Sequence, residues 1–190
     1  VAQDKPEEAV DIFERVLKFD PASVDAWVNR GLCLHVLGRS AEARASHEEA
    51  LRRDPQHAMA HFYLGCLLNE AMDSNGAWQH LDAALAAAPN DPDILVELAG
   101  LAEQNNELAL AQRYVSAGLD AAPGHPGLTL EAARLARRAG EIEAAHARLS
   151  MMERVPLSER LAQQYWFERA LVHDRRGEPA DTMRALERAH

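Results

Sequence analysis

A spacing of 34 residues recurs along this chain and restricts its fold more than any other feature. Three prolines, Pro55, Pro89 and Pro123, are separated by this interval, and small and apolar residues recur at matching offsets before each of them. A self-similar period of this length is typical of stacked helical hairpins, because each unit buries its apolar face only against its neighbours. The period therefore predicts a repeat array rather than one globular core.

Each period contains two amphipathic stretches. In the first full period, Trp27 and Leu34 lie on one helical face, and Ala43 and Ala50 lie on another. Apolar residues at i, i+3, i+4 and i+7 indicate helices with one buried side. Runs of β-branched residues with period two are absent from the sequence, so no strand is predicted. The expected fold class is all-α, with about eleven helices.

Turn and capping residues mark the helix boundaries. Glycine or asparagine stands where the first helix of four hairpins should end, at Gly38, Asn106, Gly140 and Gly177. Met72 occupies the matching position in the second hairpin, where a left-handed backbone is unfavourable for methionine, so we expect that turn to run through Asn75 and Gly76 instead. Ser23 and Asp91 are the expected N-caps of two first helices.

The repeats resemble those of the tetratricopeptide repeat family, whose pattern is W-x2-L-G-x2-Y…A-x3-F…P. The clearest matches are Trp27, Gly31, Ala43, Ala50 and Pro55, then Leu64, Gly65, Ala77, Ala84 and Pro89. The resemblance implies a right-handed α-solenoid of stacked antiparallel helix-turn-helix repeats. It divides a single array over 1–190 into a half repeat at 1–23, full repeats at 24–57, 58–91, 92–125 and 126–159, and a C-terminal hairpin at 160–190, in which the repeat register resumes near Gln163.

The two ends of the sequence fall inside this register. Val1 stands where the first helix of a repeat should be ending, and His190 directly follows a second helix. We therefore expect the sequence to be a piece of a longer protein, with apolar surface at both ends of the array. It shows no signal-like start, and the cytoplasm is the favoured compartment although no residue fixes it.

Composition excludes two classes of partner. The net charge of −10 argues against a nucleic-acid partner, because phosphate recognition requires a basic face. No apolar run reaches the length of a membrane span, so membrane insertion is not expected.

The resemblance also suggests where a partner binds. In this family the first helices line a concave groove, and an extended or helical segment of another protein is the expected occupant. The candidate groove residues are Val28, Asn29, Leu32, Phe62, Tyr63, Asn69, Arg134, Arg137, Arg138 and Arg175. We expect an apolar residue of the partner near Phe62 and Tyr63, and an acidic group or C-terminal carboxylate near the arginines.

A structural interpretation of the same residues remains open. Phe62 and Tyr63 would then pack between hairpins, and the arginines would pair with Glu131 and Glu141 on a solvated face. The family's clamp for the C-terminal tails of heat-shock chaperones is not expected, because Asp93 and Glu97 reverse the charge that it requires.

Catalytic and metal-binding motifs are absent from the sequence. His57 and His61 are spaced i,i+4, but the pattern H-E-x-x-H is missing and no third ligand is indicated. Nucleophile and phosphate-loop motifs are also missing. We expect no catalytic residue, no metal site and no cofactor in this segment.

Three functions therefore fit the sequence. The first is a protein–protein interaction scaffold that binds a peptide-like or helical segment. The second is a substrate-presenting or regulatory arm of a larger enzyme, such as a glycosyl- or sulfo-transferase. The third is a self-assembly module in which the open ends of the array bring copies together.

Overall fold

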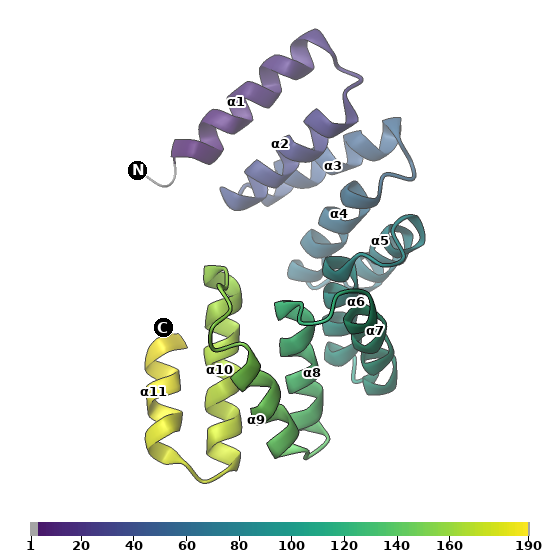
Figure 1. Cartoon of the computed structure of the whole chain (residues 1–190). Helices are drawn as coiled ribbons and strands as arrows, with labels where there is room; N and C mark the ends of the chain where they lie inside the picture. The colour runs from purple at the N-terminus through teal and green to yellow at the C-terminus, as the bar shows by residue number, and fades with distance from the viewer. Residues whose placement is uncertain (1–3, 190) are drawn as a thin grey trace. The chain divides into compact units, whose positions relative to one another are not determined.

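A computed structural model describes residues 4–189, and Val1 and His190, on which the expectations about the chain ends rest, lie outside them. The described residues form eleven α-helices and no strand, which confirms the predicted all-α class (Figure 1). The helices are α1 (Asp4–Phe19), α2 (Val24–Val36), α3 (Ser40–Arg53), α4 (Ala58–Glu70), α5 (Ser74–Ala87), α6 (Pro92–Gln104), α7 (Leu108–Ala121), α8 (Pro126–Arg138), α9 (Ile142–Met151), α10 (Glu159–Arg175) and α11 (Pro179–Ala189).

The helix starts reproduce the sequence period. The first helices α2, α4, α6 and α8 begin 34 residues apart, and the second helices α3, α5, α7 and α9 do the same. Each first helix packs against the second helix that follows it, so the chain from α2 to α11 consists of five helical hairpins, preceded by α1.

The described helices fall into two compact units, divided between residues 89 and 90. In unit 1, α1 packs on α2, α2 on α3, α3 on α4, and α4 on α5. In unit 2, α8 contacts α6, α7, α9 and α10, and the α10–α11 hairpin closes the unit. Each unit thus has its own core, as expected for repeats that contact only their neighbours.

Small residues let the helices of one hairpin approach closely. A Cβ placed on Gly31 would lie 2.5 Å from Cε1 of His47 on the partner helix. A Cβ on Gly65 would lie 2.7 Å from Cγ of Leu81. His47 and Leu81 are fully buried, so neither side chain has free space to move into. The predicted close approach is confirmed, and its physical cause is the absence of a side chain on the first helix.

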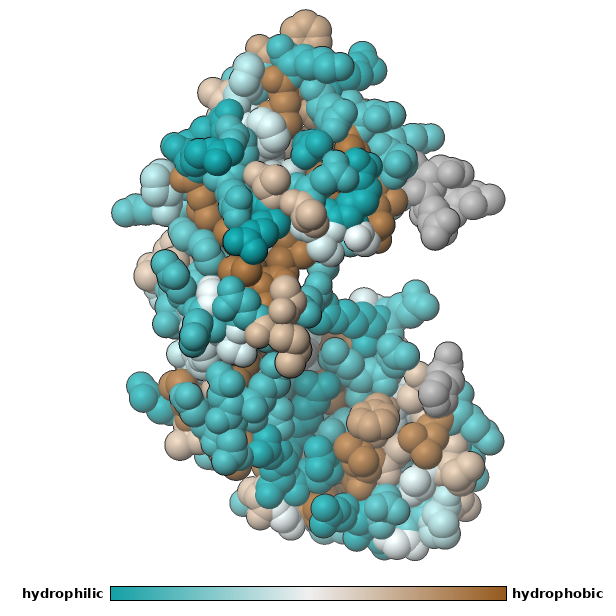
Figure 2. All heavy atoms as spheres, turned by 180° about the vertical axis from the view of Figure 1, so that it is seen from behind, coloured by the Kyte–Doolittle hydropathy of each residue, from teal (hydrophilic) through white to brown (hydrophobic). Residues whose placement is uncertain are grey.

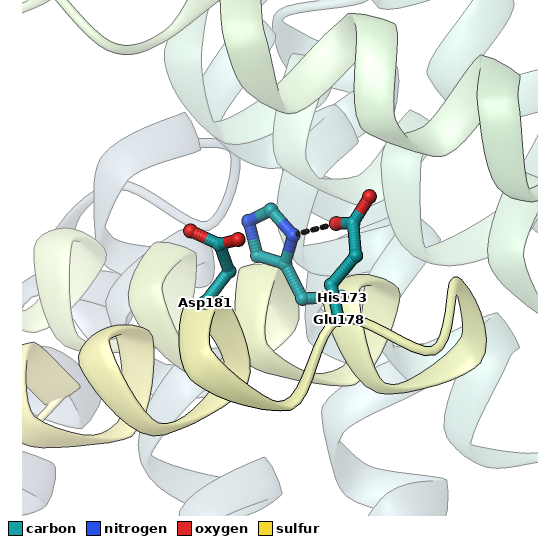
Figure 3. A group of neighbouring side chains, drawn as sticks. All are labelled: His173, Glu178 and Asp181. Atoms are coloured by element: carbon teal, nitrogen blue, oxygen red, sulfur yellow. Dashed lines mark hydrogen bonds and ion pairs between the residues drawn. The ribbon is translucent and has the colours of Figure 1, made fainter.

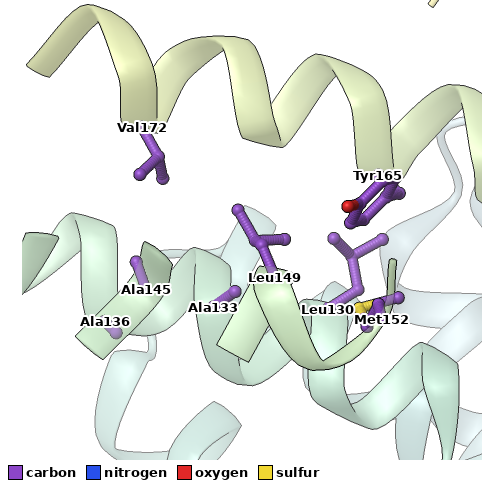
Figure 4. Packing of buried hydrophobic residues seen from close by; sticks show 8 residues of the cluster. All are labelled: Leu130, Ala133, Ala136, Ala145, Leu149, Met152, Tyr165 and Val172. Atoms are coloured by element: carbon purple, nitrogen blue, oxygen red, sulfur yellow. The ribbon is translucent and has the colours of Figure 1, made fainter. Parts of the chain in front are cut away.

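The core of unit 2 joins three consecutive helices (Figure 4). Tyr165 and Val172 point from α10 toward residues of α8 and α9, among them Leu130 and Leu149. All four side chains are at most 2% exposed. Burying apolar surface contributes about 25 cal/mol of stability per Å². These contacts therefore hold α10 against the hairpin formed by α8 and α9.

The predicted N-caps are present. Oγ of Ser23 accepts a hydrogen bond from the backbone N–H of Ala26 at 3.4 Å. Oδ1 of Asp91 accepts from the N–H groups of Asp93 and Ile94, at 3.0 and 3.2 Å. Each cap satisfies a donor that the first turn of a helix leaves without an intrahelical partner.

The turns match the sequence prediction except in the second hairpin. Gly38, Asn106, Gly140 and Gly177 all have positive φ, as predicted. The prediction for Met72 was wrong, because Met72 itself adopts φ +62°. Asn75 and Gly76 lie inside α5, whose N-terminus is capped by Asp73, with a bond of 3.0 Å from the N–H of Gly76. This cap holds α5 in the same register as the other second helices. The unfavourable left-handed conformation is adopted by Met72, whose side chain is 86% exposed.

Replacing this methionine should stabilise the chain. We expect Met72→Gly to raise the free energy of unfolding by about 1 kcal/mol, because a left-handed conformation costs a residue with a Cβ about 1–2 kcal/mol. Gly38→Ala, at the matching turn of the first hairpin, should lower the free energy of unfolding by a similar amount. Urea denaturation of both variants measures the two changes, and a destabilised Met72→Gly would contradict the explanation.

The last hairpin begins within one residue of its predicted start at 160, although the repeat register was expected to resume only near Gln163. α9 ends at Met151, and α10 begins at Glu159, four residues before Gln163. Oγ of Ser158 caps α10 by accepting from the N–H of Leu161 at 3.4 Å. Leu161 also packs against the core of unit 2, so an extra helical turn buries apolar surface that a loop would expose.

Candidate functional site

The candidate groove residues of unit 1 lie on α2 and α4, and one of them is part of the core. Val28 is 6% exposed and packs with Ala50 and Ala60. Its predicted place in a groove was therefore wrong, because the α2 face that carries Val28 turns toward α3 and α4. Asn29 is exposed, and its side-chain amide donates to the backbone carbonyl of Asp25 at 2.8 Å.

Four candidates in unit 1 are partly exposed, namely Leu32, Phe62, Tyr63 and Asn69. Tyr63 stacks on the buried ring of His47, with ring centroids 5.4 Å apart, and it packs against the cluster around Val28. The ring of Phe62 lies 5.3 Å from that of Tyr63. Tyr63 thus contributes to packing between hairpins, as the structural interpretation predicts, while both rings keep part of their surface in solvent.

His47 occupies the position at which the repeat pattern has phenylalanine. The ring is fully buried, and neither ring nitrogen has a hydrogen-bond partner among the described residues. Burial lowers the pKa of His47 to about 4, so the ring is neutral at physiological pH. His47 therefore acts here as a packing residue and not as a ligand.

The candidate arginines of unit 2 are engaged by carboxylates of the same unit. Arg134 pairs with Glu131 on its own helix, and Arg137 donates to both oxygens of Glu168 on α10, at 2.5 and 3.3 Å. Arg138 reaches back to α6, where it donates to Oε1 of Glu103 at 2.5 Å.

The structural interpretation of these arginines is confirmed for Glu131 and wrong for Glu141. Glu141 is exposed on the turn before α9, and within the described part of the chain it pairs with none of the candidate arginines. Arg175 is exposed near the end of α10. An acidic partner group would have to displace internal carboxylates from three of the four arginines.

A row of carboxylates lies on the first helices of unit 2. Glu97, Glu131 and Glu168 occupy corresponding positions on α6, α8 and α10. Glu131 and Glu168 are only 5% and 3% exposed. Glu97 and Glu131 are 34 residues apart, and Glu168 follows 37 residues after Glu131, because three extra residues precede the last repeat. Burial raises the pKa of Glu131 to about 7, against the opposing charge of Arg134.

A pocket of about 320 Å³ opens beside this row, where α6, α8 and α10 begin. It is lined by Asp93, Val96, Glu97, His125, Pro126, Gly127, Ser158, Arg160, Leu161 and Gln164. The lining combines apolar side chains with carboxylate, imidazole, guanidinium, hydroxyl and amide groups, which is the mixture typical of a binding pocket. We call the exposed sides of α6, α8 and α10 the first-helix face of unit 2.

Histidines cap two first helices, a role that the sequence did not suggest. Nδ1 of His57 accepts from the N–H of Ala60 at 3.2 Å, and Nδ1 of His125 accepts from the N–H of Leu128 at 3.4 Å. Nε2 of His57 lies 3.6 Å from Asp25, one repeat earlier. His57 is thus used by the backbone and is not available as a metal ligand together with His61.

His61 forms a hydrogen bond with a second histidine. Its Nδ1 lies 2.9 Å from Nδ1 of His80 on α5, and its Nε2 lies 3.0 Å from the carbonyl oxygen of Pro55. The carbonyl can only accept, so Nε2 of His61 donates to it and Nδ1 accepts from His80. Both nitrogens of His61 are therefore engaged within unit 1.

His173, Glu178 and Asp181 form the one group of potential metal ligands found among the described residues (Figure 3). Nδ1 of His173 bonds to Glu178 at 2.6 Å, and Nε2 of His173 accepts from Arg169 at 3.3 Å. Asp181 pairs with Arg184. Guanidinium groups thus contact both the histidine and the aspartate, and this positive charge does not suit a cation.

The surface of the molecule is mainly polar on the face that Figure 2 shows. On the face shown in Figure 2, hydrophilic side chains prevail, and apolar surface is confined to patches between them. Within residues 4–189, no helix combines the length and apolar character that crossing a bilayer requires.

These features define a class of protein, the helical repeat proteins built from antiparallel hairpins. Residues 1–58 and 37–92 match the sequence model of the tetratricopeptide repeat family. The predicted resemblance to the tetratricopeptide repeat family and the predicted fold class are confirmed.

Two curated relatives are enzymes that match over short segments. A probable UDP-N-acetylglucosamine–peptide N-acetylglucosaminyltransferase SPINDLY of Solanum lycopersicum is 30% identical over 89 residues, 47% of this chain and 10% of that protein. A probable biofilm formation methyltransferase WspC of Pseudomonas putida is 34% identical over 76 residues, 40% of this chain and 18% of that protein. The chain thus spans less than a fifth of either relative.

Solved structures of low sequence identity share the fold. The Cut9–Hcn1 hetero-tetramer of the APC/C superposes with a TM-score of 0.90 at 14% identity, covering 97% of this chain and 36% of that chain. The type IV pilus biogenesis factor PilW gives a TM-score of 0.79 at 21% identity, covering 96% and 83%. YrrB, described as a tetratricopeptide repeat protein with an unusual peptide-binding site, gives 0.65 at 15% identity, covering 93% and 90%.

Proposed function

We propose that this chain is a protein–protein interaction scaffold that binds a peptide-like segment of a partner on its first helices. The pocket on the first-helix face of unit 2 is the observation that carries the proposal. Three successive first helices contribute to it, so an extended segment lying across them would contact each repeat in turn. Val96 and Leu161 offer apolar contacts, and Glu97 and Gln164 offer polar ones.

Unit 1 supports the same function with a different chemistry. Phe62 and Leu32 are partly exposed on α4 and α2, where they can contact an apolar side chain of the partner. Fold alone does not determine function, so the proposal depends on these exposed residues and not on the family. The similarity to YrrB, a protein described as having a peptide-binding site, is consistent with it.

A library of random twelve-residue peptides displayed on phage tests the proposal directly. We expect the chain to enrich a peptide family, and we expect Gln164→Trp, which fills the pocket, to weaken binding of the selected peptides at least tenfold. Gln79→Trp places the same side chain on an exposed position of α5 and should leave their binding unchanged. Both variants should keep the melting temperature of the parent.

Two results would contradict the proposal. The first is a library that yields no peptide above the background of a bare support. The second is a set of peptides that bind Gln164→Trp and Phe62→Ala as tightly as the parent chain, since those peptides would recognise neither first-helix surface. If Phe62→Ala instead lowers the melting temperature sharply, Phe62 is a packing residue. The binding of the peptides to Gln164→Trp then decides whether the proposal stands.

A second candidate function is the substrate-presenting or regulatory arm of a larger transferase. The short match to SPINDLY favours it, because the similar segment is a small part of that longer transferase. The two candidates share the same binding surface. Mass spectrometry of the intact gene product distinguishes them, because an arm requires a catalytic domain in the same polypeptide.

A further inference from the structure

The sequence contains one asparagine–glycine pair, Asn75–Gly76, and it lies in the first turn of α5. Such a pair is chemically labile, because glycine has no side chain to hinder attack by its backbone nitrogen on the preceding carboxamide. Asn75 is exposed, and its side chain has no hydrogen-bond partner among the described residues. The carboxamide is therefore free to rotate toward the nitrogen of Gly76.

The way in which α5 begins explains why a glycine follows the asparagine. The backbone N–H of Gly76 donates to Oδ1 of Asp73, the N-cap of α5, at 3.0 Å. A Cβ on residue 76 would lie 2.6 Å from Oδ2 of Asp73 and 3.1 Å from Cδ1 of Leu68 on α4. A larger residue would therefore push the capping carboxylate away and weaken the start of the helix. The labile pair is thus a consequence of the cap.

The same cap holds the pair in an unreactive geometry. In a regular helix ψ is about −42°, which keeps the nitrogen of one residue away from the side chain of the residue before it. The hydrogen bond to Asp73 also occupies the N–H group that would react. The first turn of α5 must therefore open first. Helix ends open more readily than helix interiors, and opening this end relaxes the left-handed Met72 as well.

We propose that Asn75 is a site of spontaneous deamidation and that the Asp73 cap controls its rate. When the first turn opens, the backbone nitrogen of Gly76 attacks Cγ of Asn75 and forms a C–N bond. The proton of that N–H group passes through water to the side-chain NH2 group, which leaves as ammonia and gives a succinimide ring. A water molecule then opens the ring at one of its two carbonyl groups, so the product is aspartate or isoaspartate.

The two products affect α5 in opposite ways. Aspartate at position 75 leaves the main chain unchanged and places a negative charge in the first helical turn, where the helix dipole favours it. Isoaspartate adds a methylene group to the main chain and so moves the N–H of Gly76 away from Asp73. It should therefore weaken the packing of α5 on α4, where the buried Leu81 lies against Gly65.

Mass spectrometry of peptides from the whole chain, after incubation for several weeks at pH 8, tests the proposal. The measured quantity is the rate at which the carboxamide of Asn75 becomes a carboxyl group. Asp73→Ala should raise this rate about fivefold, because loss of an N-cap shifts the opening of the first turn by about that factor. Met72→Gly should lower it by a similar factor, because opening then relieves no strain.

Two controls make the test specific. Gly38→Ala weakens the matching turn of the first hairpin and leaves the Asp73 cap intact, so it should not change the rate at Asn75. Asn90 is an internal reference, because it is exposed in a loop but precedes Asp91, whose side chain hinders ring closure. In urea that unfolds the chain, the parent and Asp73→Ala should react at the same rate at Asn75.

Three results would overturn the proposal. The first is an unchanged rate at Asn75 in Asp73→Ala, since the cap would then have no control over the reaction. The second is a rate at Asn75 no higher than that at Asn90 in the Asp73→Ala chain, because the pair would then not be labile. The third is equal acceleration by Gly38→Ala, which would show that the reaction follows general unfolding and not the opening of α5.

Discussion

Gly31→Ala should lower the free energy of unfolding by about 3 kcal/mol, the largest single effect that we expect in unit 1. The new Cβ would lie 2.5–2.9 Å from three atoms of the His47 ring. That ring is fully buried and stacks on Tyr63, so it has no space to move into. Overpacking of a rigid contact typically costs about 1–3 kcal/mol, and the effect here should fall at the upper end because the obstacle is a planar ring. Chemical denaturation of the whole chain measures it.

Gly100→Ala is the matched control for this prediction. It is also a glycine within a first helix, but a Cβ added there meets nothing within 4 Å. We expect it to raise the free energy of unfolding by about 0.5–1 kcal/mol, because alanine favours the helix. A double variant, Gly31→Ala with His47→Ala, should be less destabilised than the sum of the two single changes, since removing the His47 ring removes the clash that Gly31→Ala creates. Additive losses, or a neutral Gly31→Ala, would contradict the proposed contact.

Glu131→Gln should stabilise unit 2 at pH 8 by about 2–3 kcal/mol. The pKa of Glu131 is raised to about 7 by burial, whereas a carboxyl group in an unfolded chain titrates near 4.5. Between pH 4.5 and pH 7, Glu131 is therefore protonated in the folded state and ionised in the unfolded chain. The stability that Glu131 contributes is fully present below pH 4.5 and is lost as the pH rises through 7, at about 1.4 kcal/mol per unit of pKa difference. Glutamine keeps the shape of the side chain and removes this loss.

Urea unfolding at pH 5 and pH 8 measures this effect. The two proteins should be nearly equal at pH 5, where Glu131 is protonated in the folded state, and the variant should be more stable at pH 8. Glu168→Gln provides the control of opposite sign. Glu168 is just as buried, but it accepts two hydrogen bonds from Arg137, so its replacement should destabilise by about 1–3 kcal/mol. If Glu131→Gln loses stability at pH 8, the Arg134 pair outweighs the burial cost.

The helices of this fold could be predicted because their signals are local and repeated. Apolar spacing, the caps at Ser23 and Asp91 and the turn glycines lie within a few residues of the boundaries that they set. The turn at Met72 was predicted incorrectly, and α10 begins four residues before Gln163, because the backbone at both places follows the neighbouring structure. The side chain of Asp73 caps α5 after the strained residue, and Leu161 is recruited into the core of unit 2.

The candidate site was predicted in part. The repeat register placed the candidate groove on the first helices, and the pocket lies on three of them, although none of the ten candidate residues lines it. It could not show that Val28 turns inward, nor that Arg137 and Arg138 already have partners 31 and 35 residues away in sequence. Ion pairs between repeats depend on side-chain directions, and spacing along one helix does not determine these.

The sequence by itself determined the hairpins and their register, because helix periodicity, capping and turn conformation are short-range properties. Only the tertiary structure decided which charges are satisfied and which are not. Glu131, Glu168 and Glu97 occupy equivalent positions in the repeat, yet one carboxylate is doubly bonded, one lines a pocket, and one has an oxygen without a donor. The physical reason is that burial and the charges of neighbouring helices set the energy of an ionised group, and both arise only when the repeats pack together.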